Sequence, residues 1–475
     1  MSQTLLAPFR ETLEGIKSSE FSFTDVVAKY ISSINNQKHL NAFLEVFEDD
    51  AISFSKIVDE KIKNNSAGKL GGMVIAIKDV INIKDKRTTC GSKILENFIA
   101  PYDATVIERL KKSDATLIGK TNMDEFAMGS SNENSAYGAV LHPLDNSRVP
   151  GGSSGGSAVA VAAKMAMTSL GTDTGGSIRQ PAGFCGIFGM KPTYGRVSRY
   201  GLVAFASSFD QIGVFSSTPK DLASVLEVIS GHDEKDSTSS KIEVGEYLKN
   251  INPDVKGLKI GLPKEYFHKD LPKEINDLIS EKINFLKSKG AKFVEVTLPH
   301  SDYTIATYYI LATAEASSNL ARYDGARYGY RSKNSNSLTQ MYEASRSEGF
   351  GSEVKARIML GTYVLSSGYY DAYYKKAQKV RRLIQNDFLE AYKQVDCILT
   401  PITPSTAFKI GEKTDDPLQM YLSDVFTVSA NLAGIPGINI PIGFDKNNLP
   451  VGMQILGKHF DEQILLNVAE CCFKN

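Results

Sequence analysis

The sequence predicts a fold of the α/β class, with one β-sheet covered by helices. The main observation is a strand–helix–strand pattern over residues 258–298, where "LKIGL" and "KFVEVTL" flank the helical stretch "EINDLISEKINFLKSKG". Two strands joined by a helix pair in parallel and place that helix against the sheet. A second helix followed by a strand is predicted at 104–121, in "ATVIERLKKSDATLIGKT". Length alone, 475 residues, would suggest two or three domains.

The N-terminal part is predicted to be helical up to about residue 60. In "SFTDVVAKYISSI" (22–34), apolar residues recur at nearly helical spacing after a Ser/Thr start. "GGMVIAIKDVINI" (71–83) then predicts a buried strand, because its branched residues are bounded by glycines.

Glycine dominates the next region. Residues 129–213 contain 15 of the 38 glycines, together with an Ala-rich helix predicted in "SAVAVAAKMAM" (157–167). A flexible linker would be polar and repetitive, whereas apolar segments interrupt these glycines. The composition therefore predicts a buried centre in which backbone segments approach one another closely.

The second half of the chain begins with a linker-like stretch at 231–256, which is polar and lacks periodicity. Residues 303–374 contain 12 of the 21 tyrosines, mostly on helix-like sequence. The segments expected to form the last strands are "VDCILTP" (395–401), "GINIPIGF" (437–444) and "PVGMQIL" (450–456).

Composition excludes several classes of protein. The 54 basic and 54 acidic residues balance, whereas a protein that binds nucleic acid unaided usually has a basic excess. The start lacks a charged segment followed by an apolar core, and no run of 18 apolar residues follows, so neither a secretory signal nor a membrane span is predicted. Five scattered cysteines are typical of reduced thiols, which predicts a cytoplasmic protein.

Nucleotide and zinc sites are not supported by the motifs. "DATLIGKT" ends like a P-loop, but Asp114 stands where the first glycine is required. None of the six histidines lies in an H-E-x-x-H frame. Each is expected to be a surface or capping residue: His39, His142, His232, His268, His300 and His459.

A base other than histidine is available. Lys78 lies within the apolar segment "VIAIKDVINI", and burial lowers the pKa of a lysine, so that its neutral amine can act as a general base near pH 7. The alternative is a lysine on an edge strand whose side chain reaches water. In "GTDTGGSIRQP" (171–181), successive N–H groups ahead of Ser177 can form a concavity that binds an oxyanion. The alternative there is a tight turn at a strand end.

These residues resemble the signature of the amidase family. The resemblance rests on "VPGGSSGGSAVAVAA" (149–163), "SLGTDTGGSIRQPAGFCGIFGMKPTYGRVSRYG" (169–201) and the upstream lysine strand. It implies one amidase-signature domain over 1–475, with a central mixed β-sheet covered by helices on both faces. Within it we expect a helical N-terminal segment (1–60), the signature core (70–215) and a tyrosine-rich helical segment (300–385).

The resemblance also implies a catalytic Ser–cis-Ser–Lys triad. Carried over residue by residue, the general base is Lys78, the relay is Ser153 after a cis peptide bond, and the nucleophile is Ser177. The backbone N–H groups of Thr174, Gly175 and Gly176, with that of Ser177, would form the oxyanion hole. Ser154 would line the loop, and Ser157 is expected to cap the following helix.

The tyrosine-rich segment is similar to one branch of the family, the glutaminase subunits of tRNA-dependent amidotransferases. In that branch the substrate-binding residues fall on Arg357, Asp424, Tyr308 and Gly129. Arg357 would pair with the α-carboxylate of glutamine and Asp424 with its α-ammonium. Without the resemblance, Arg357 would be interpreted as a helix-surface charge and Asp424 as a helix cap. One departure from the branch is Ser429, in "TVSANLAG", where a proline is expected.

The resemblance implies hydrolysis of glutamine through an acyl-serine and delivery of ammonia for converting Glu-tRNA(Gln), Asp-tRNA(Asn) or both. ATP and Mg²⁺ would bind to a partner, the kinase and transamidase subunit, which would also contact most of the tRNA, and a small third subunit would complete the complex. No metal or cofactor is expected in this chain. The alternatives are a free-standing amidase that acts on small or lipid amides and a non-catalytic scaffold, and the intact Lys78, Ser153 and Ser177 argue against the scaffold.

Overall fold

The computed structural model describes residues 4–267 and 271–474. Its described strands form one mixed sheet of 11, in the order β1-β3-β2-β4-β6-β5-β10-β11-β9-β7-β8. The strands are β1 (Phe43–Val46), β2 (Val74–Lys78), β3 (Thr116–Thr121), β4 (Thr168–Asp173), β5 (Phe188–Lys191), β6 (Gln211–Ser216), β7 (Lys259–Pro263), β8 (Lys292–Val296), β9 (Cys397–Pro401), β10 (Gly437–Phe444) and β11 (Pro450–Gly457).

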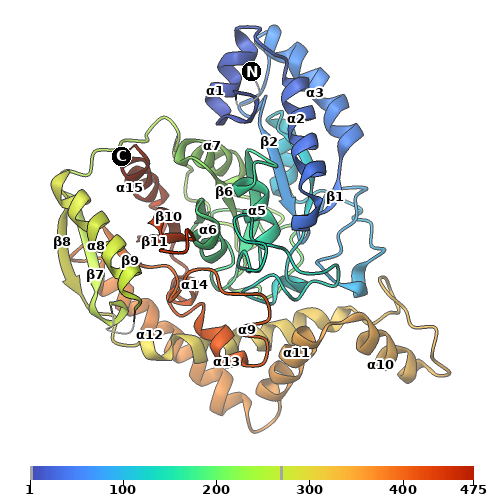
Figure 1. Ribbon diagram of the computed structural model, residues 1–475. Helices are drawn as coiled ribbons and strands as arrows, with labels where there is room; N and C mark the ends of the chain where they lie inside the picture. The colour runs from blue at the N-terminus through green and yellow to red at the C-terminus, as the bar shows by residue number, and fades with distance from the viewer. Residues whose placement is uncertain (1–3, 268–270, 475) are drawn as a thin grey trace.

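The helices cover this sheet on both faces, as the sequence predicts. They are α1 (Phe9–Lys17), α2 (Phe23–Asn36), α3 (Glu48–Lys63), α4 (Thr105–Lys112), α5 (Gly155–Ala162), α6 (Arg179–Cys185), α7 (Pro219–Ile229), α8 (Lys273–Ser288), α9 (Thr304–Asn319), α10 (Leu338–Gly349), α11 (Ser352–Leu365), α12 (Lys376–Ala391), α13 (Pro417–Leu422), α14 (Val428–Ala433) and α15 (Glu462–Phe473). Helices α1–α3 lie at one end of the molecule, and α10 and α11 lie at the opposite rim (Figure 1).

The strand–helix–strand unit of the second half is confirmed. Strands β7 and β8 pair in parallel on either side of α8 in the sequence, and β9 joins β7 in parallel. The last strands, β10 and β11, form an antiparallel pair with a bulge near Gly443, which has a positive φ of 151°.

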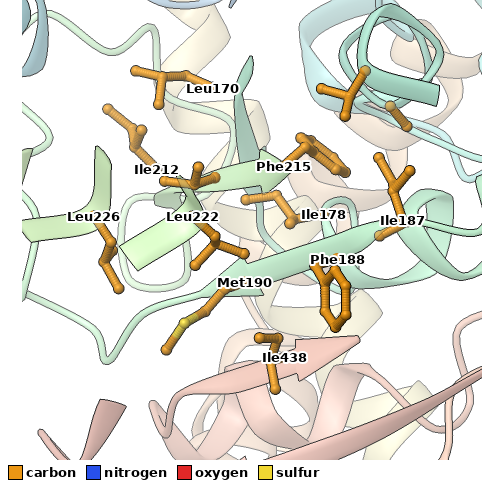
Figure 2. Packing of buried hydrophobic residues seen from close by; sticks show 14 of the residues in the cluster. Leu170, Ile178, Ile187, Phe188, Met190, Ile212, Phe215, Leu222, Leu226 and Ile438 are labelled. Carbon is orange, nitrogen blue, oxygen red and sulfur yellow. The ribbon is translucent and has the colours of Figure 1, made fainter. Parts of the chain in front are cut away.

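The middle of the sheet comes from the glycine-rich region. Strands β4, β6 and β5 pair in antiparallel fashion between β2 and β10. Met190 of β5 lies opposite Ile438 of β10 (Figure 2). The pairing of these two strands connects the first half of the chain to the second half within the sheet. Small residues allow close approach here, because a Cβ on Gly213 would lie 2.1 Å from the carbonyl oxygen of Met190.

Two local expectations need correction. The Ala-rich helix ends at Ala162 instead of continuing to Met167, because Lys164 adopts a positive φ of 54° and Thr168 begins β4. The linker-like segment 231–256 lies against the folded body, where the Arg196 guanidinium donates hydrogen bonds to the carbonyl oxygens of Ile242 and Glu243.

Candidate active site

The lysine that the sequence singles out lies at the end of a buried strand. Lys78 ends β2, which is an interior strand of the sheet, so the interpretation of an edge-strand lysine reaching water is wrong. Its Nζ lies 2.8 Å from three hydroxyl oxygens, those of Ser153, Ser154 and Thr172. Burial lowers the pKa of Lys78 to about 7, although the charges of Asp124, Asp173 and Asp210 oppose this shift.

The hydroxyl neighbours orient the Lys78 amine. Ser154 Oγ donates its hydrogen to the Thr172 carbonyl oxygen at 3.0 Å, so it faces Lys78 as an acceptor. A neutral amine has two N–H bonds and one lone pair. When the two N–H groups of Lys78 donate to Ser154 and Thr172, the lone pair points at Ser153 Oγ. Ser154 is therefore part of the arrangement around Lys78 and does more than line the loop.

Ser153 lies in a tightly packed loop. The peptide bond between Gly152 and Ser153 is cis, as the resemblance implies. A Cβ on Gly152 would lie 2.1 Å from the carboxylate of Asp124, and the Gly152 N–H donates to Gln180 Oε1 at 3.1 Å. Glycine is required at this position because a side chain would displace one of these neighbours.

Asp124 was not predicted as part of the site. It follows β3 and is fully buried, and its carboxylate accepts the N–H groups of Asn132 and Asn134 at 2.9 and 3.0 Å. Its own N–H donates to the Ser153 carbonyl oxygen at 3.2 Å. Asp124 therefore joins the Ser153 loop to the segment 129–134.

Ser177 lies on the turn between β4 and α6. The Asp173 carboxylate accepts the N–H groups of Gly176 at 2.9 Å and Ile178 at 3.2 Å, and pairs with Arg179 at 3.0 Å. Burial opposes ionisation of Asp173, but the Arg179 guanidinium holds its pKa at about 2. This ion pair is fully buried and fixes both ends of the turn that presents Ser177.

The same arginine connects the turn to the end of the chain. Its guanidinium also donates to Gln454 Oε1 in β11 at 3.0 Å, to Asn431 Oδ1 in α14 at 2.7 Å and to the Thr427 carbonyl oxygen at 3.1 Å. Neither Asp173 nor Arg179 was a predicted site residue, although both lie in the quoted segment 171–181.

The turn offers donors for an oxyanion. In the described part of the chain, the N–H groups of Gly175 and Ser177 donate to no protein acceptor, whereas that of Gly176 is engaged by Asp173. Tyr308 lies directly against the turn, since a Cβ on Gly175 would be 2.6 Å from its hydroxyl oxygen. Thr427 Oγ1 donates to the Gly175 carbonyl oxygen at 2.6 Å and holds the turn from the other side.

Gln180 of α6 connects the Ser177 turn to the Ser153 loop. Its side chain accepts the N–H of Gly152 and donates to the Ser130 carbonyl oxygen. Among the described residues, no hydrogen bond joins Ser153 Oγ directly to Ser177 Oγ. The structure thus brings Lys78 and Ser153 into contact and places the Ser177 turn on the adjoining loop.

The predicted substrate residues are buried. Arg357, on α11, donates from Nε to Glu353 Oε1 at 2.7 Å, and its guanidinium lies over the rings of Tyr309 and Tyr421. The interpretation of Arg357 as a surface charge is therefore wrong. Asp424 is also buried, and its carboxylate accepts the Ser130 hydroxyl, so its interpretation as a helix cap is wrong as well.

Gly129 completes this group of residues. It precedes Ser130, and a Cβ at Gly129 would lie 2.3 Å from the Asp124 carboxyl carbon. Burial raises the pKa of Asp424 to about 7, despite its hydrogen bond from Ser130 and the charge of Arg357. The departure at Ser429 has a local partner, because the Tyr266 hydroxyl donates to Ser429 Oγ at 2.7 Å.

Two expectations about single residues are wrong. Ser157 does not cap α5 but lies inside it, and its hydroxyl donates to the Leu170 carbonyl oxygen at 3.0 Å. His142 is buried, with its ring nitrogens 2.9 Å from the Phe184 carbonyl oxygen and 3.2 Å from the Leu144 N–H. His268 lies outside the described residues.

Residues 4–267 and 271–474 contain no cluster of three His, Cys, Asp or Glu side chains that could hold a metal ion. Within the same residues, no helix is long and apolar enough to cross a membrane. The five cysteines are buried and form no disulfide bonds.

Comparison with known proteins decides the family. The family model described as Amidase matches residues 25–466. The chain belongs to the amidase family. This amidase is 57% identical over 462 residues to a glutamyl-tRNA(Gln) amidotransferase subunit of Sulfurihydrogenibium sp. (strain YO3AOP1), covering 97% of this chain and 95% of that protein. The protein of the same name from Prosthecochloris aestuarii is 56% identical, with 97% of each chain covered.

Solved structures lead to the same family. The crystal structure of the equally named glutamyl-tRNA(Gln) amidotransferase subunit of Thermotoga maritima has a TM-score of 0.81 and is 43% identical, covering 98% of this amidase and 94% of that chain. The peptide amidase of Stenotrophomonas maltophilia has a TM-score of 0.82 and is 28% identical, covering 98% and 96% of the two chains.

Proposed function

We propose that this amidase is the glutaminase subunit of a tRNA-dependent amidotransferase. The observation that carries the chemistry is the contact of the buried Lys78 with Ser153 at 2.8 Å, beside the turn that presents Ser177. The full-length similarity to proteins named as glutamyl-tRNA(Gln) amidotransferase subunits supports the biological role and favours Glu-tRNA(Gln) as the acceptor.

The reaction begins with attack of Ser177 Oγ on the amide carbon of glutamine. Its proton passes to Ser153, whose own proton passes to the lone pair of neutral Lys78. The carbonyl oxygen becomes an oxyanion, which the N–H groups of Gly175 and Ser177 stabilise, with Thr174 and Gly176 shaping the turn.

The tetrahedral intermediate then collapses. The C–N bond breaks, the nitrogen takes the proton back through Ser153, and ammonia leaves behind a γ-glutamyl ester on Ser177. Water, deprotonated by the same Ser153–Lys78 pair, hydrolyses the ester and releases glutamate. The net reaction consumes glutamine and water and produces glutamate and ammonia.

Substrate recognition is assigned to the two buried charges. The terminal nitrogens of Arg357 can bind the α-carboxylate in a bidentate manner, because Glu353 occupies only Nε. Asp424, when ionised, pairs with the α-ammonium. We assign Tyr308, which lies against Gly175 of the turn, and Gly129, which lies against Asp124, to the same substrate site.

The ammonia is used elsewhere in the complex. We assign ATP and Mg²⁺ to the kinase and transamidase subunit, which also binds the mischarged tRNA, and expect a small third subunit to complete the assembly. The chain itself uses no cofactor in this mechanism, since every proton transfer is made by Lys78 and the two serines.

The experiment that tests this proposal measures ammonia release from glutamine, asparagine and a panel of simple and peptide amides, with and without co-expressed partner subunits. Release confined to glutamine, or nearly so, is expected because the site provides for both an α-carboxylate and an α-ammonium. Broad hydrolysis of amides without partners would contradict the proposal and indicate a free-standing amidase.

The pH dependence of kcat and of kcat/KM should distinguish the role of Lys78 as the base from the role of Asp424 in binding the substrate. Lys78 must lose its proton, and Asp424 must lose its proton before it can pair with an ammonium, and both have a pKa of about 7. Well below pH 7, kcat/KM should therefore approach a fall of about 100-fold per pH unit, but kcat only about tenfold, because bound glutamine keeps Asp424 ionised.

The control is Asp424→Asn, measured by the same initial-rate assay across pH 5–8. This variant binds glutamine more weakly, but its kcat/KM should fall only about tenfold per unit, since one titrating group remains. A wild-type kcat that does not change across this range would exclude Lys78 as the base.

A further inference from the structure

Helix α11 has apolar side chains on two opposite faces. Its inner face packs on α9, where a Cβ on Gly361 would lie 2.0 Å from the Thr313 carbonyl oxygen. Its outer face exposes Met359 (67%), Leu360 (42%) and Tyr363 (46%), and the first two lie four and three residues before Tyr363, on the same side of the helix. The inner apolar face is covered by α9, whereas Met359, Leu360 and Tyr363 on the outer face remain exposed in this chain.

The exposed face continues into the turn that follows. The rings of Tyr363 and Tyr369 are 4.2 Å apart, and those of Tyr369 and Tyr373 are 6.0 Å apart and stacked. Tyr373 belongs to a short π-helix, Tyr370–Lys375, that leads into α12. We refer to Met359, Leu360, Tyr363, Tyr369 and Tyr373 as the aromatic face. Helix α11, which carries the first three of them, lies at the rim of the molecule opposite α1–α3 (Figure 1). Exposed tyrosine and methionine side chains in one cluster are typical of protein interfaces.

The surroundings of the aromatic face are basic. Residues 366–383 contain five basic residues besides one acidic residue, Asp371, which already pairs with Lys375 at 2.7 Å. Lys376, Lys379 and Arg382 of this stretch are all exposed. Two copies of the chain meeting through this face would bring like charges together, so charge opposes self-association and favours a partner with an acidic rim.

We propose that the aromatic face is a docking surface for the protein subunit of the amidotransferase that receives the ammonia. This inference rests on the proposed function. The occupant is a protein with an apolar patch surrounded by acidic residues. The position suits this role, because Arg357 lies on the inner side of the same helix and the partner would bind one helix away from the substrate site.

The test is the affinity of the purified amidase for its co-expressed ATP-dependent partner, measured by calorimetry for wild type, Met359→Glu and Tyr363→Glu. Each variant should bind at least tenfold more weakly, because a buried charge would face an apolar patch. The matched control is Ile57→Glu on α3, which is 53% exposed and far from α11, and it should bind like wild type. Far-ultraviolet circular dichroism and thermal melting check that every variant is folded.

The outcomes separate the two proposals. If both variants bind the ATP-dependent partner with wild-type affinity, the docking surface is wrong and the glutaminase assignment stands. If wild type does not bind this partner at all, both proposals are wrong. If the variants lose affinity for tRNA but not for the protein partner, the aromatic face binds RNA and the docking proposal is wrong.

Discussion

Replacing Ser177 with alanine is expected to abolish glutamine-dependent amidation of the tRNA while ammonia-dependent amidation by the same complex continues. In the proposed mechanism Ser177 Oγ forms the acyl-enzyme, so without it the rate with glutamine should fall by about 10⁴–10⁶-fold, as for other enzymes that lose a nucleophile. Added ammonia bypasses this chain, so that reaction needs only the partner. Both rates are measured as conversion of Glu-tRNA(Gln) to Gln-tRNA(Gln) in the assembled complex.

A matched control is Ser169→Ala. Ser169 is also buried and lies on β4, the strand that leads to the Ser177 turn, but its hydroxyl donates only to the Ser157 carbonyl oxygen. Both activities of this variant should stay within a few-fold of wild type. Loss of the ammonia-dependent reaction in a folded Ser177→Ala complex would contradict the division of labour between the subunits.

Replacing Arg179 with methionine is expected to lower the free energy of unfolding by about 3–5 kcal/mol, because it leaves the buried Asp173 carboxylate without its partner. Asn431, Gln454 and the Thr427 carbonyl oxygen lose their donor at the same time. The measurement is the midpoint of denaturant unfolding of the purified chain, together with its m-value.

The comparison is Arg382→Met on α12, an arginine near the surface that donates to Gln385. Arg382→Met should change the free energy of unfolding by less than about 0.5 kcal/mol. If Arg179→Met costs no more than this control, the Asp173–Arg179 pair does not hold the turn.

The segments with a clear local pattern are the parts of the fold that the sequence predicts. β7, α8 and β8 form a strand–helix–strand pattern, and β2, β10 and β11 are apolar runs bounded by glycine or proline. The centre is different: β4 has the sequence "TSLGTD" and β5 has "FGMK", and neither segment has strand character alone. These segments become strands because their neighbours in the sheet supply partners, which no local pattern reports.

The residues of the candidate active site also fall into two groups, those that the sequence predicts and those that only the structure shows. Lys78 stands out in the sequence because a cation in an apolar strand must be explained, and the resemblance supplies Ser153 and Ser177. Thr172 and Asp124 act through contacts with residues far away in the sequence, such as Thr172 with Lys78 at 2.8 Å. Only the folded chain brings these residues together, so spacing in the sequence could not identify them.

The pairing of β5 with β10 affects how the protein is made. Roughly 250 residues separate these strands, so at about 5–20 residues per second β10 leaves the ribosome roughly 12–50 seconds after β5. During that interval the nascent chain presents the unpaired edge of β5, with Met190 lacking Ile438 and Arg179 lacking Gln454. The half of the chain that contains Lys78, Ser153 and Ser177 is thus made first, but its sheet is completed last. An open strand edge of this kind is where newly made chains aggregate or bind chaperones.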